Sequence, residues 1–559
     1  MILFFILVMF SVNLFSQSKA DENFQKLASE ILDNLQKYYP VRSSEKGIHK
    51  YDYLVTDYSR RSVRSEIAKL KKFETRLYKY KNSNLTQTNR INHQLLKSNL
   101  DITLYDLSRI KWHTKNPYLY INEAVNSVYF LLISEHAPLS ERAQNILARM
   151  KSIPDLFVQA QDNLKNPPPV YIEEAREMIK TGIDFFNSVK IELSKDVPAL
   201  ASEINNAAVR VERSLNEFDN FLANCNPGEE ASFAIGKGDF DYKLKYEYFL
   251  DFDIDSLLRI GQTLFEEADS AYKAYESWLA INDPLDSVFV PSSLTKQDIL
   301  DYYNWELNKV KQFLISEDIL TIPEDIGECK IIETPEVFRS IIGSIAYQMP
   351  GTFNSDQTGH FYVKPISENL DAADREYYFK NMHNRAFKRS VVHEAYPGHH
   401  LQLQMAGRSK SDVRKWQDNY CLIEGWALYS EEMMHQSGLY GNDKRSYLKI
   451  LGGIRFRAMR IILDVKLHTG QFSRDEAVKW LTGIWGGYED YAKSEVNGCA
   501  LNPTYKMSYL IGKTQILKLL DDYKNKEGDN FSLKAFHDRL LSEGSIPIPL
   551  IRKSWGLSK

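Results

Sequence analysis

The chain has 559 residues, of which 43% are hydrophobic and 26% are charged, a composition typical of a globular protein with a sizeable core. Its formal net charge of -4 is small and is spread along the chain, which argues against a nucleic-acid-binding protein. With only 26 glycines and 19 prolines, the composition favours helices over a turn-rich β architecture.

The first residues form a short apolar segment. Residues 2–15, ILFFILVMFSVNLF, are too few to span a bilayer comfortably, and the small residue Ala20 follows shortly afterwards. We interpret residues 1–20 as a cleaved secretory signal peptide, with a retained membrane anchor as the alternative. We therefore expect a secreted or periplasmic protein without stable membrane insertion after cleavage. No cysteine directly follows the run, so we expect no lipid anchor.

Residues 21 to about 225 are predicted to form long amphipathic helices. In residues 65–82, SEIAKLKKFETRLYKYKN, apolar and aromatic residues recur every three to four positions with charges between them. The clearest predicted loop is 224–241, which contains Asn-Pro-Gly. Further helical patterns occupy 121–154, interrupted at Pro138, then 171–193 and 253–280.

The pattern changes between about 329 and 366, and helices are predicted again from 371 onward. Residues 329–335 and 359–367 are short, β-branched and aromatic, which predicts a small hairpin or edge strand. We interpret residues 347–363 as an edge strand that pairs with an extended substrate backbone, with a surface hairpin as the alternative.

No internal repeat and no linker divides the chain. We therefore expect residues 21–559 to form one domain of two intertwined lobes, a helical lobe at 21–328 and a second lobe at 329–559 that carries the chemical motifs. The four cysteines lie far apart in sequence and outside any CxxC motif, so disulfide pairing and four free thiols both stay open. They are Cys225, Cys329, Cys421 and Cys499.

Residues 393–402, HEAYPGHHLQ, begin like a zinc-protease motif. In the HExxH pattern, two histidines four positions apart on one helix hold Zn²⁺, and the intervening glutamate is the general base. His393 and Glu394 match its start, which predicts a metal ligand and a general base, but Pro397 stands where the second histidine is expected.

The Pro-Gly pair at 397–398 offers a way to restore the second ligand. Proline removes a helical hydrogen bond and glycine tolerates distorted dihedrals, so the helix can bulge there. A two-residue bulge would bring His399 to the place of the second histidine. His400 is the alternative, because a residue seven positions after His393 is nearly in line with it on an uninterrupted helix.

A catalytic zinc site needs a third protein ligand. Glu424 lies 25 residues after His399 in CLIEGWALYSEEMMH, and we predict that it supplies this ligand from a neighbouring helix. The alternative is an acid that stabilises a helix N-terminus. Glu431 lies seven positions later on the same face and is predicted to orient a ligand. The pattern predicts one Zn²⁺ ion.

Other polar residues are interpreted as structural. Arg460, Asp464 and His468 are four positions apart, which is compatible with a second metal site but favours a buried stripe that braces the helix. The lone histidines that we assign structural roles are His360, His383 and His435.

The motifs HEAYPGHHLQ, EGWALYSE, RFRAMRIILDVKLHTGQFSRDEAVKWL and MSYLIGK, in this order, resemble the bacterial "domain of unknown function 885" family. Its members resemble zincin metallopeptidases of the helical oligopeptidase kind. The resemblance implies a mostly α, two-lobed helical body with a deep cleft, one Zn²⁺ and hydrolysis of peptides. By matching position, it implies His393, His399 and Glu424 as metal ligands and Glu394 as the base, in a catalytic lobe at 329–559.

The last motif supplies a candidate to stabilise the oxyanion of the reaction. Tyr509 in MSYLIGK is the matching residue, and Tyr505, four positions earlier, shares its helix face. The family tends to have an Arg-Tyr pair and a Pro-Gly-Gln here. This chain keeps Pro503, lacks the Arg-Tyr pair and has Thr504-Tyr505 in place of Gly-Gln.

These features predict an exported zinc-dependent peptidase that hydrolyses short peptides, with Glu394 as general base and Tyr509 as oxyanion donor. The alternative is a non-catalytic exported protein that binds zinc or peptide on a peptidase-like scaffold. The intact pair of His393 and Glu394 favours the enzyme, because binding alone does not require a general base.

Overall fold

The computed structural model describes residues 2–283, 294–339, 342, 345–364, 366, 371–373, 375–376, 386–486 and 489–557. It is mostly α-helical with one small sheet, which confirms the predicted fold class. His383 lies outside the described residues.

Long helices dominate the first half, as predicted. Pro138 separates two of them, and Ser59 and Thr86 cap others by accepting a hydrogen bond from the backbone N–H three residues ahead. The helices are α1 Ile2–Tyr38, α2 Pro40–Glu45, α3 Arg60–Leu77, α4 Gln87–Tyr105, α5 Trp112–Lys115, α6 Tyr118–Ile133, α7 Leu139–Asn163, α8 Pro169–Asp196, α9 Ala201–Asn224, α10 Gly236–Tyr246, α11 Ile254–Asn282 and α12 Lys296–Ser316.

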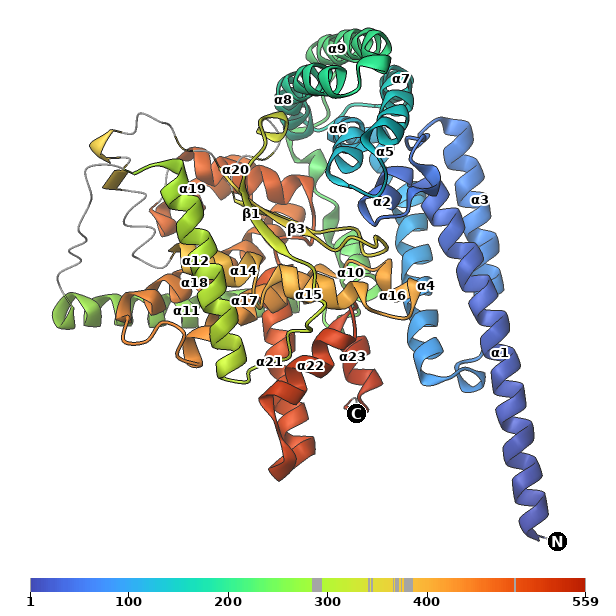
Figure 1. Cartoon of the computed structure of the whole chain (residues 1–559), viewed down its shortest axis with the longest axis vertical. Helices are drawn as coiled ribbons and strands as arrows, with labels where there is room; N and C mark the ends of the chain where they lie inside the picture. Colours follow the sequence, from blue (N-terminus) through green and yellow to red (C-terminus); the bar gives the residue numbers. More distant parts are fainter. Residues whose placement is uncertain are drawn as a thin grey trace.

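The second half carries the motif helices. They are α14 Ala386–Glu394, α15 His399–Gly407, α16 Asp412–Lys415, α17 Tyr420–Gln436, α18 Lys444–His468, α19 Arg474–Trp485, α20 Glu489–Leu501, α21 Ser508–Glu527, α22 Leu533–Ser542 and α23 Ile548–Ser554. In Figure 1, α6 to α9 group at one end, and the strands lie between that group and α14, α15 and α17.

Two sequence predictions need correction. The loop predicted over 224–241 is wrong from Gly236 onward, where α10 begins, because burial of Phe240 outweighs the low helix propensity of the glycines. The strands β1 Cys329–Glu333 and β3 Gly359–Val363 pair in parallel, so they do not form a hairpin with each other, but β1 is an edge strand, the other form that was predicted. The central strand is β3, and β2 Ala346–Gln348 pairs antiparallel on its other side. Within 347–363 the structure therefore has an edge strand, β2, and also the hairpin that was the alternative, formed by β2 and β3.

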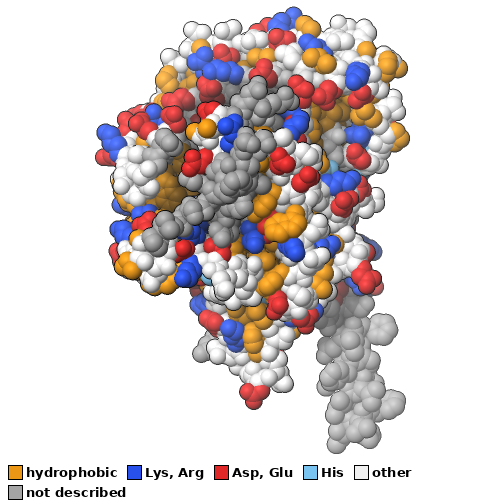
Figure 2. Space-filling model, turned by 60° about the vertical axis from the view of Figure 1, so that its left-hand side comes forward, with side chains coloured by type: hydrophobic (Ala, Val, Ile, Leu, Met, Phe, Trp, Pro, Cys, Tyr) orange, Lys and Arg blue, Asp and Glu red, His pale blue; other side chains and the backbone are white. Residues whose placement is uncertain are grey.

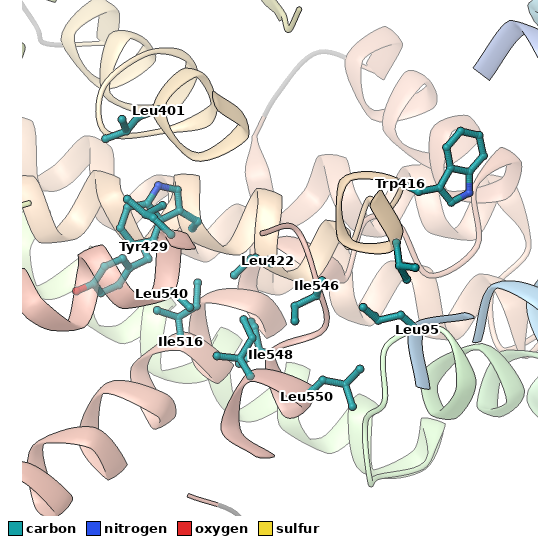
Figure 3. Packing of buried hydrophobic residues seen from close by; sticks show 14 of the residues in the cluster. Leu95, Leu401, Trp416, Leu422, Tyr429, Ile516, Leu540, Ile546, Ile548 and Leu550 are labelled. Carbon is teal, nitrogen blue, oxygen red and sulfur yellow. The ribbon is translucent and has the colours of Figure 1, made fainter. Parts of the chain in front are cut away.

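Buried hydrophobic residues form four clusters, and each draws residues from both sides of position 328. The largest joins Phe24 of α1 to helices near the C-terminus. Figure 3 shows part of it, where Leu401 of α15, Leu422 of α17 and Ile516 of α21 are buried close to α22 and α23. This shared packing fixes the motif helices against one another; the lobe boundary and the signal peptide stay predictions.

The surface, the N-terminal helix and the cysteines add further observations. On the face in Figure 2, basic and acidic side chains are interspersed without a large patch of one sign. Helix α1 continues across the predicted cleavage position after Ala20. Among the described residues, no helix combines the length and apolar character needed to cross a membrane. All four cysteines are free, and three of them are buried.

Candidate metal centre

The backbone between α14 and α15 forms the bulge that the sequence suggested. The Gly398 N–H donates to the carbonyl oxygen of Val392 at 3.0 Å, six residues back where a regular helix would use four. A Cβ on Gly398 would lie 1.9 Å from the carbonyl oxygen of His393, so only glycine fits here. The two extra residues place His399 at the start of α15, on the same side of the bulged helix as His393.

Helix α17 is fixed to this bulge and brings the third side chain. Trp426 Nε1 donates to the carbonyl oxygen of Pro397 at 2.8 Å. Glu424 lies two positions before it on the same helix. A Cβ on Gly425 would lie 2.5 Å from the backbone of Gly512, so these glycines let α17 and α21 approach closely.

Three donor atoms converge between these helices. Nε2 of His393 lies 3.7 Å from Oε2 of Glu424, and Nε2 of His399 lies 3.5 Å from the same oxygen. One donor atom from each of the three residues lies within 4.8 Å of the others. Among the described residues, the buried Oε2 of Glu424 has no hydrogen-bond partner. Separations longer than hydrogen bonds and an unsatisfied oxygen fit a cation between the three.

Glu431 orients one of the imidazoles, as predicted. Its Oε1 lies 2.8 Å from Nδ1 of His393, which leaves Nε2 directed at the cluster. Burial raises the pKa of Glu431, but Arg457, Arg389 and the hydrogen bond from His393 outweigh burial and lower it to about 2. Burial lowers the pKa of His393, but Glu424 and Glu431 outweigh it and raise the pKa to about 9. The imidazole of His399 has no equivalent hydrogen bond, since its Nδ1 has no partner among the described residues.

His400, the alternative ligand, is directed away from the cluster. Its Nδ1 lies 2.8 Å from the hydroxyl of Tyr347 and its Nε2 lies 2.9 Å from the carbonyl oxygen of Gly327. Burial lowers its pKa to about 4. Because both ring nitrogens have partners in the protein, His400 has no lone pair for the cluster.

Glu394, the predicted base, ends α14 directly beside His393. Its negative charge contributes to the raised pKa of His393. In the part of the chain that the structure describes, its carboxylate has neither a hydrogen bond nor an ion pair.

Two tyrosines form a chain of polar contacts that begins at Glu424 of the cluster. The hydroxyl of Tyr505 donates to Oε1 of Glu424 at 2.8 Å, and the hydroxyl of Tyr509 lies 3.1 Å from that of Tyr505. The direct neighbour of the cluster is therefore Tyr505, which the sequence reasoning named only as sharing a face with Tyr509. Asp464 positions this segment by accepting hydrogen bonds from the N–H groups of Thr504 and Met507.

The stripe of Arg460, Asp464 and His468 has a bracing role. Arg460 forms a bidentate ion pair with Glu495, and Nε2 of His468 lies 2.9 Å from the carbonyl oxygen of Cys499. Each member of the stripe is already bonded to the protein, which fits the structural interpretation.

The sequence reasoning missed a second group of ligand-type residues. His49, Asp52 and His136 also place one donor atom each within 4.8 Å of one another. They come from η1 (His49–Tyr51), the residue after it and the α6–α7 connection, so no motif or spacing could have linked them.

A cavity of about 700 Å³ opens beside the first cluster. His399 and Glu424 line it from one side, and Tyr347 and Gln348 of β2 line it as well. Residues of α2, α4, α5, α6 and α10 contribute to the remaining lining, so the cavity lies between segments far apart in sequence.

The comparisons with known proteins bear on the family and the fold. The structure is similar to "a putative lipoprotein of unknown function from Shewanella oneidensis", with a TM-score of 0.77 and 21% identity over 95% of this chain and 99% of that one. It is also similar to "the putative lipoprotein from Colwellia psychrerythraea", with a TM-score of 0.77 and 18% identity over 95% and 98%. At these identities the likeness establishes the fold. No curated protein matches the chain. Residues 40–554 match the family described as "Bacterial protein of unknown function (DUF885)", and the chain therefore belongs to that family.

Proposed function

We propose that this protein is an exported, zinc-dependent peptidase that hydrolyses short peptides. The proposal depends on one observation above all. Two imidazole nitrogens of His393 and His399 converge with an oxygen of Glu424 that has no hydrogen-bond partner among the described residues, and Glu394, whose charge acts on His393, follows it directly in the chain. Two nitrogens and one oxygen are a ligand set that suits catalytic zinc and leaves one position open.

The chemistry follows from the roles of the residues. When bound, Zn²⁺ would act as a Lewis acid and lower the pKa of water in the open position toward about 7. Glu394 accepts a proton from the water that attacks the scissile carbonyl, and then transfers it to the leaving amine. Glu431 keeps the His393 ring in the same orientation throughout the reaction.

The tyrosine pair supplies hydrogen-bond donors for the negative charge that develops on the carbonyl oxygen. In the resting arrangement Tyr505 donates to Glu424, and the hydroxyl of Tyr509 lies within hydrogen-bond distance of Tyr505. Tyr509 therefore has to exchange that contact for the substrate oxygen as the reaction proceeds.

The cavity supports short peptides as substrates. Its volume of about 700 Å³ is in the range of small-ligand sites and excludes a folded protein. Strand β2, at the edge of the sheet, contributes Tyr347 and Gln348 to the lining, so an extended peptide could pair with that edge. Export is proposed from the apolar N-terminal segment and from the description of two similar structures as lipoproteins.

The test is incubation of the purified protein with a mixed peptide library, with and without a chelator, followed by mass spectrometry and metal analysis. We expect cleavage that chelation abolishes. Glu394→Gln should keep zinc and lose about 10²–10⁴-fold in kcat. Glu217→Gln, on the exposed face of α9, is the matched control and should leave both unchanged.

Two outcomes would contradict the proposal. Full activity of Glu394→Gln would remove the assigned base. Bound zinc without cleavage of any peptide would favour the non-catalytic binding protein.

A further inference from the structure

Thr504 has a backbone conformation that a threonine side chain disfavours. Its φ of 74° lies in the left-handed region, where a β-branched residue is a genuine outlier. Among the described residues, five non-glycine residues have a positive φ, and Thr504 is the only β-branched one. Such a conformation persists only where the surrounding structure holds it, and it is enriched at functional sites.

Buried side chains from two other segments hold Thr504 in place. Asp464 of α18 is fully buried and accepts the Thr504 N–H on Oδ1 at 3.2 Å and the Met507 N–H on Oδ2 at 3.4 Å. Tyr248, in the connection between α10 and α11, donates its hydroxyl to the carbonyl oxygen of Thr504 at 3.4 Å. Because Thr504 is itself only 1% exposed, its backbone N–H and C=O depend on these two side chains for their hydrogen bonds.

The next residue, Tyr505, carries the side chain that reaches the metal cluster. Its hydroxyl donates to Oε1 of Glu424 at 2.8 Å. The other oxygen of this carboxylate, Oε2, has no hydrogen-bond partner among the described residues and faces the imidazoles of His393 and His399. Tyr505 therefore fixes the rotation of the Glu424 carboxylate and leaves one oxygen for the cation.

The torsion at Thr504 sets the direction of the Tyr505 side chain. Because φ and ψ are the soft torsions of the backbone, relaxation of Thr504 to a negative φ would redirect the chain at Tyr505. The Tyr505 ring is packed on two sides, with its centroid 4.9 Å from that of Tyr420 and 5.8 Å from that of Tyr509. A redirected chain would therefore withdraw the hydroxyl from the metal cluster and break both ring contacts.

We infer that Asp464, by holding Thr504 in its left-handed conformation, is a positioning residue that directs the Tyr505 hydroxyl to Glu424. This inference rests on the proposed function, because Glu424 is the third proposed zinc ligand. It gives Asp464 a role beyond bracing α18. Zinc affinity then depends on a buried carboxyl group that acts through the backbone of 504–507 and not through the ligands themselves.

The test is a double-mutant cycle between Asp464 and Tyr505, with zinc affinity as the readout. In the wild-type background, Tyr505→Phe should lower zinc affinity by about three- to tenfold, because one hydrogen bond to Glu424 is lost. In the Asp464→Ala background, the same change should lower it by less than about twofold, since the hydroxyl no longer reaches Glu424. Asp464→Ala alone should cost about as much affinity as Tyr505→Phe.

Thr504→Gly should rescue Asp464→Ala, which a merely structural role of Asp464 does not predict. Glycine adopts a positive φ about as readily as a negative one, so the turn no longer needs Asp464 to hold it. In Asp464→Ala/Thr504→Gly the zinc affinity should return toward that of the wild type, and Tyr505→Phe should again lower it by about threefold or more.

Leu463→Ala is the matched control for general weakening of α18. It truncates a buried side chain directly beside Asp464 in the chain, and Tyr505→Phe should keep its full effect in this background. Asp464→Asn covers the case that Asp464→Ala does not fold. It keeps the side-chain volume and one acceptor oxygen, so Tyr505→Phe should cost less affinity in this background than in the wild type, and an equal cost would overturn the inference.

The outcomes separate the positioning role from the proposed function. Equal losses on Tyr505→Phe in the wild-type and Asp464→Ala backgrounds, or no rescue by Thr504→Gly, would overturn the inference and leave the peptidase proposal intact. If the wild type binds no zinc, the proposed function fails, and the same cycle is measured as shifts of the urea unfolding midpoint. A midpoint shift on Tyr505→Phe that Asp464→Ala removes and Thr504→Gly restores supports the positioning role, and additive shifts overturn it.

Discussion

Two groups of ligand-type side chains lie in this protein, and their comparison shows why distance alone does not define a metal site. His393, His399 and Glu424 meet the same 4.8 Å criterion as His49, Asp52 and His136. In the first group, Oε2 of Glu424 has no hydrogen-bond partner among the described residues, and two Nε2 atoms face it. These lone pairs are available to a cation.

In the second group the ligand-type atoms of His49 and Asp52 are already used. Nδ1 of His49 lies 2.8 Å from Asp52, and its Nε2 lies 2.8 Å from Oδ1 of Asn354. The other Asp52 oxygen accepts a hydrogen bond from Ser44 at 2.6 Å and faces the buried Arg149 at 4.0 Å.

The ring geometry leads to the same conclusion. The His49 and His136 rings stack with centroids 3.3 Å apart and planes 6° from parallel, so their in-plane lone pairs do not converge. We interpret the second group as a polar network that joins η1 to the loop after β2. Unsatisfied, convergent lone pairs distinguish the candidate metal centre from this network.

The largest expected effect is loss of metal from one group only. Alanine at His393, His399 or Glu424 should abolish high-affinity zinc binding, because each change removes one of three ligands. His49→Ala and His136→Ala are the matched controls and should retain about one zinc per chain. Metal analysis after dialysis measures this directly. Two zinc ions per chain, with one lost in His136→Ala, would refute the distinction.

Substitution of Glu431, which orients His393 in the first group, should have a smaller effect on zinc binding. Glu431→Gln should weaken zinc binding by about 10–100-fold, the usual result of removing the carboxylate behind a ligating histidine. Glu432→Gln changes the neighbouring residue, which pairs with Lys513, and serves as control. Competition with a chromophoric chelator gives both affinities. Equal affinities would mean that Glu431 does not support the ligand.

Substitutions in the second group should lower the stability of the fold and leave the zinc content unchanged. Asp52→Ala removes the carboxylate near the buried Arg149 and the acceptor of His49 and Ser44, so we expect a loss of about 3 kcal/mol in the free energy of unfolding. Urea unfolding of the metal-free protein measures this loss. Unchanged stability together with lost zinc would reverse the roles of the two groups.

The smallest expected effect concerns the tyrosine beside Glu424. Tyr505→Phe removes one hydrogen bond worth about 0.5–1.5 kcal/mol, so zinc affinity should fall by at most about tenfold. Tyr420→Phe keeps the neighbouring ring and is the control. A loss as large as that of Glu424→Ala would instead make Tyr505 part of the ligand set.

Much of the fold and of the first group follows from local sequence. Periodicity predicts helices because the buried stripe repeats with the helical turn, and Pro138 marks the break between α6 and α7. The bulge at Pro397-Gly398 was predictable because both residues act on their own backbone. The choice of His399 over His400 required the contacts of His400 with Tyr347 and Gly327, which lie far from it in sequence.

What the sequence could not give depends on contacts between distant segments. The parallel pairing of β1 with β3 is decided by the chain between them, and short strands carry no signal for direction. The position of Tyr505 against Glu424 depends on the close approach of α17 and α21. The group of His49, Asp52 and His136 has no common motif, and so only coordinates reveal it.

The contact of Gly425 with Gly512 has a consequence for how the molecule moves. A methyl group on either glycine would strike the opposite backbone, so the two helices can keep this spacing only with glycine at both positions. This contact fixes the spacing between α17, which carries Glu424, and α21, which carries Tyr509. Under the proposed function, we therefore expect substrate to enter by displacement of the opposite side of the cavity, which includes residues of α2, α4 and α6.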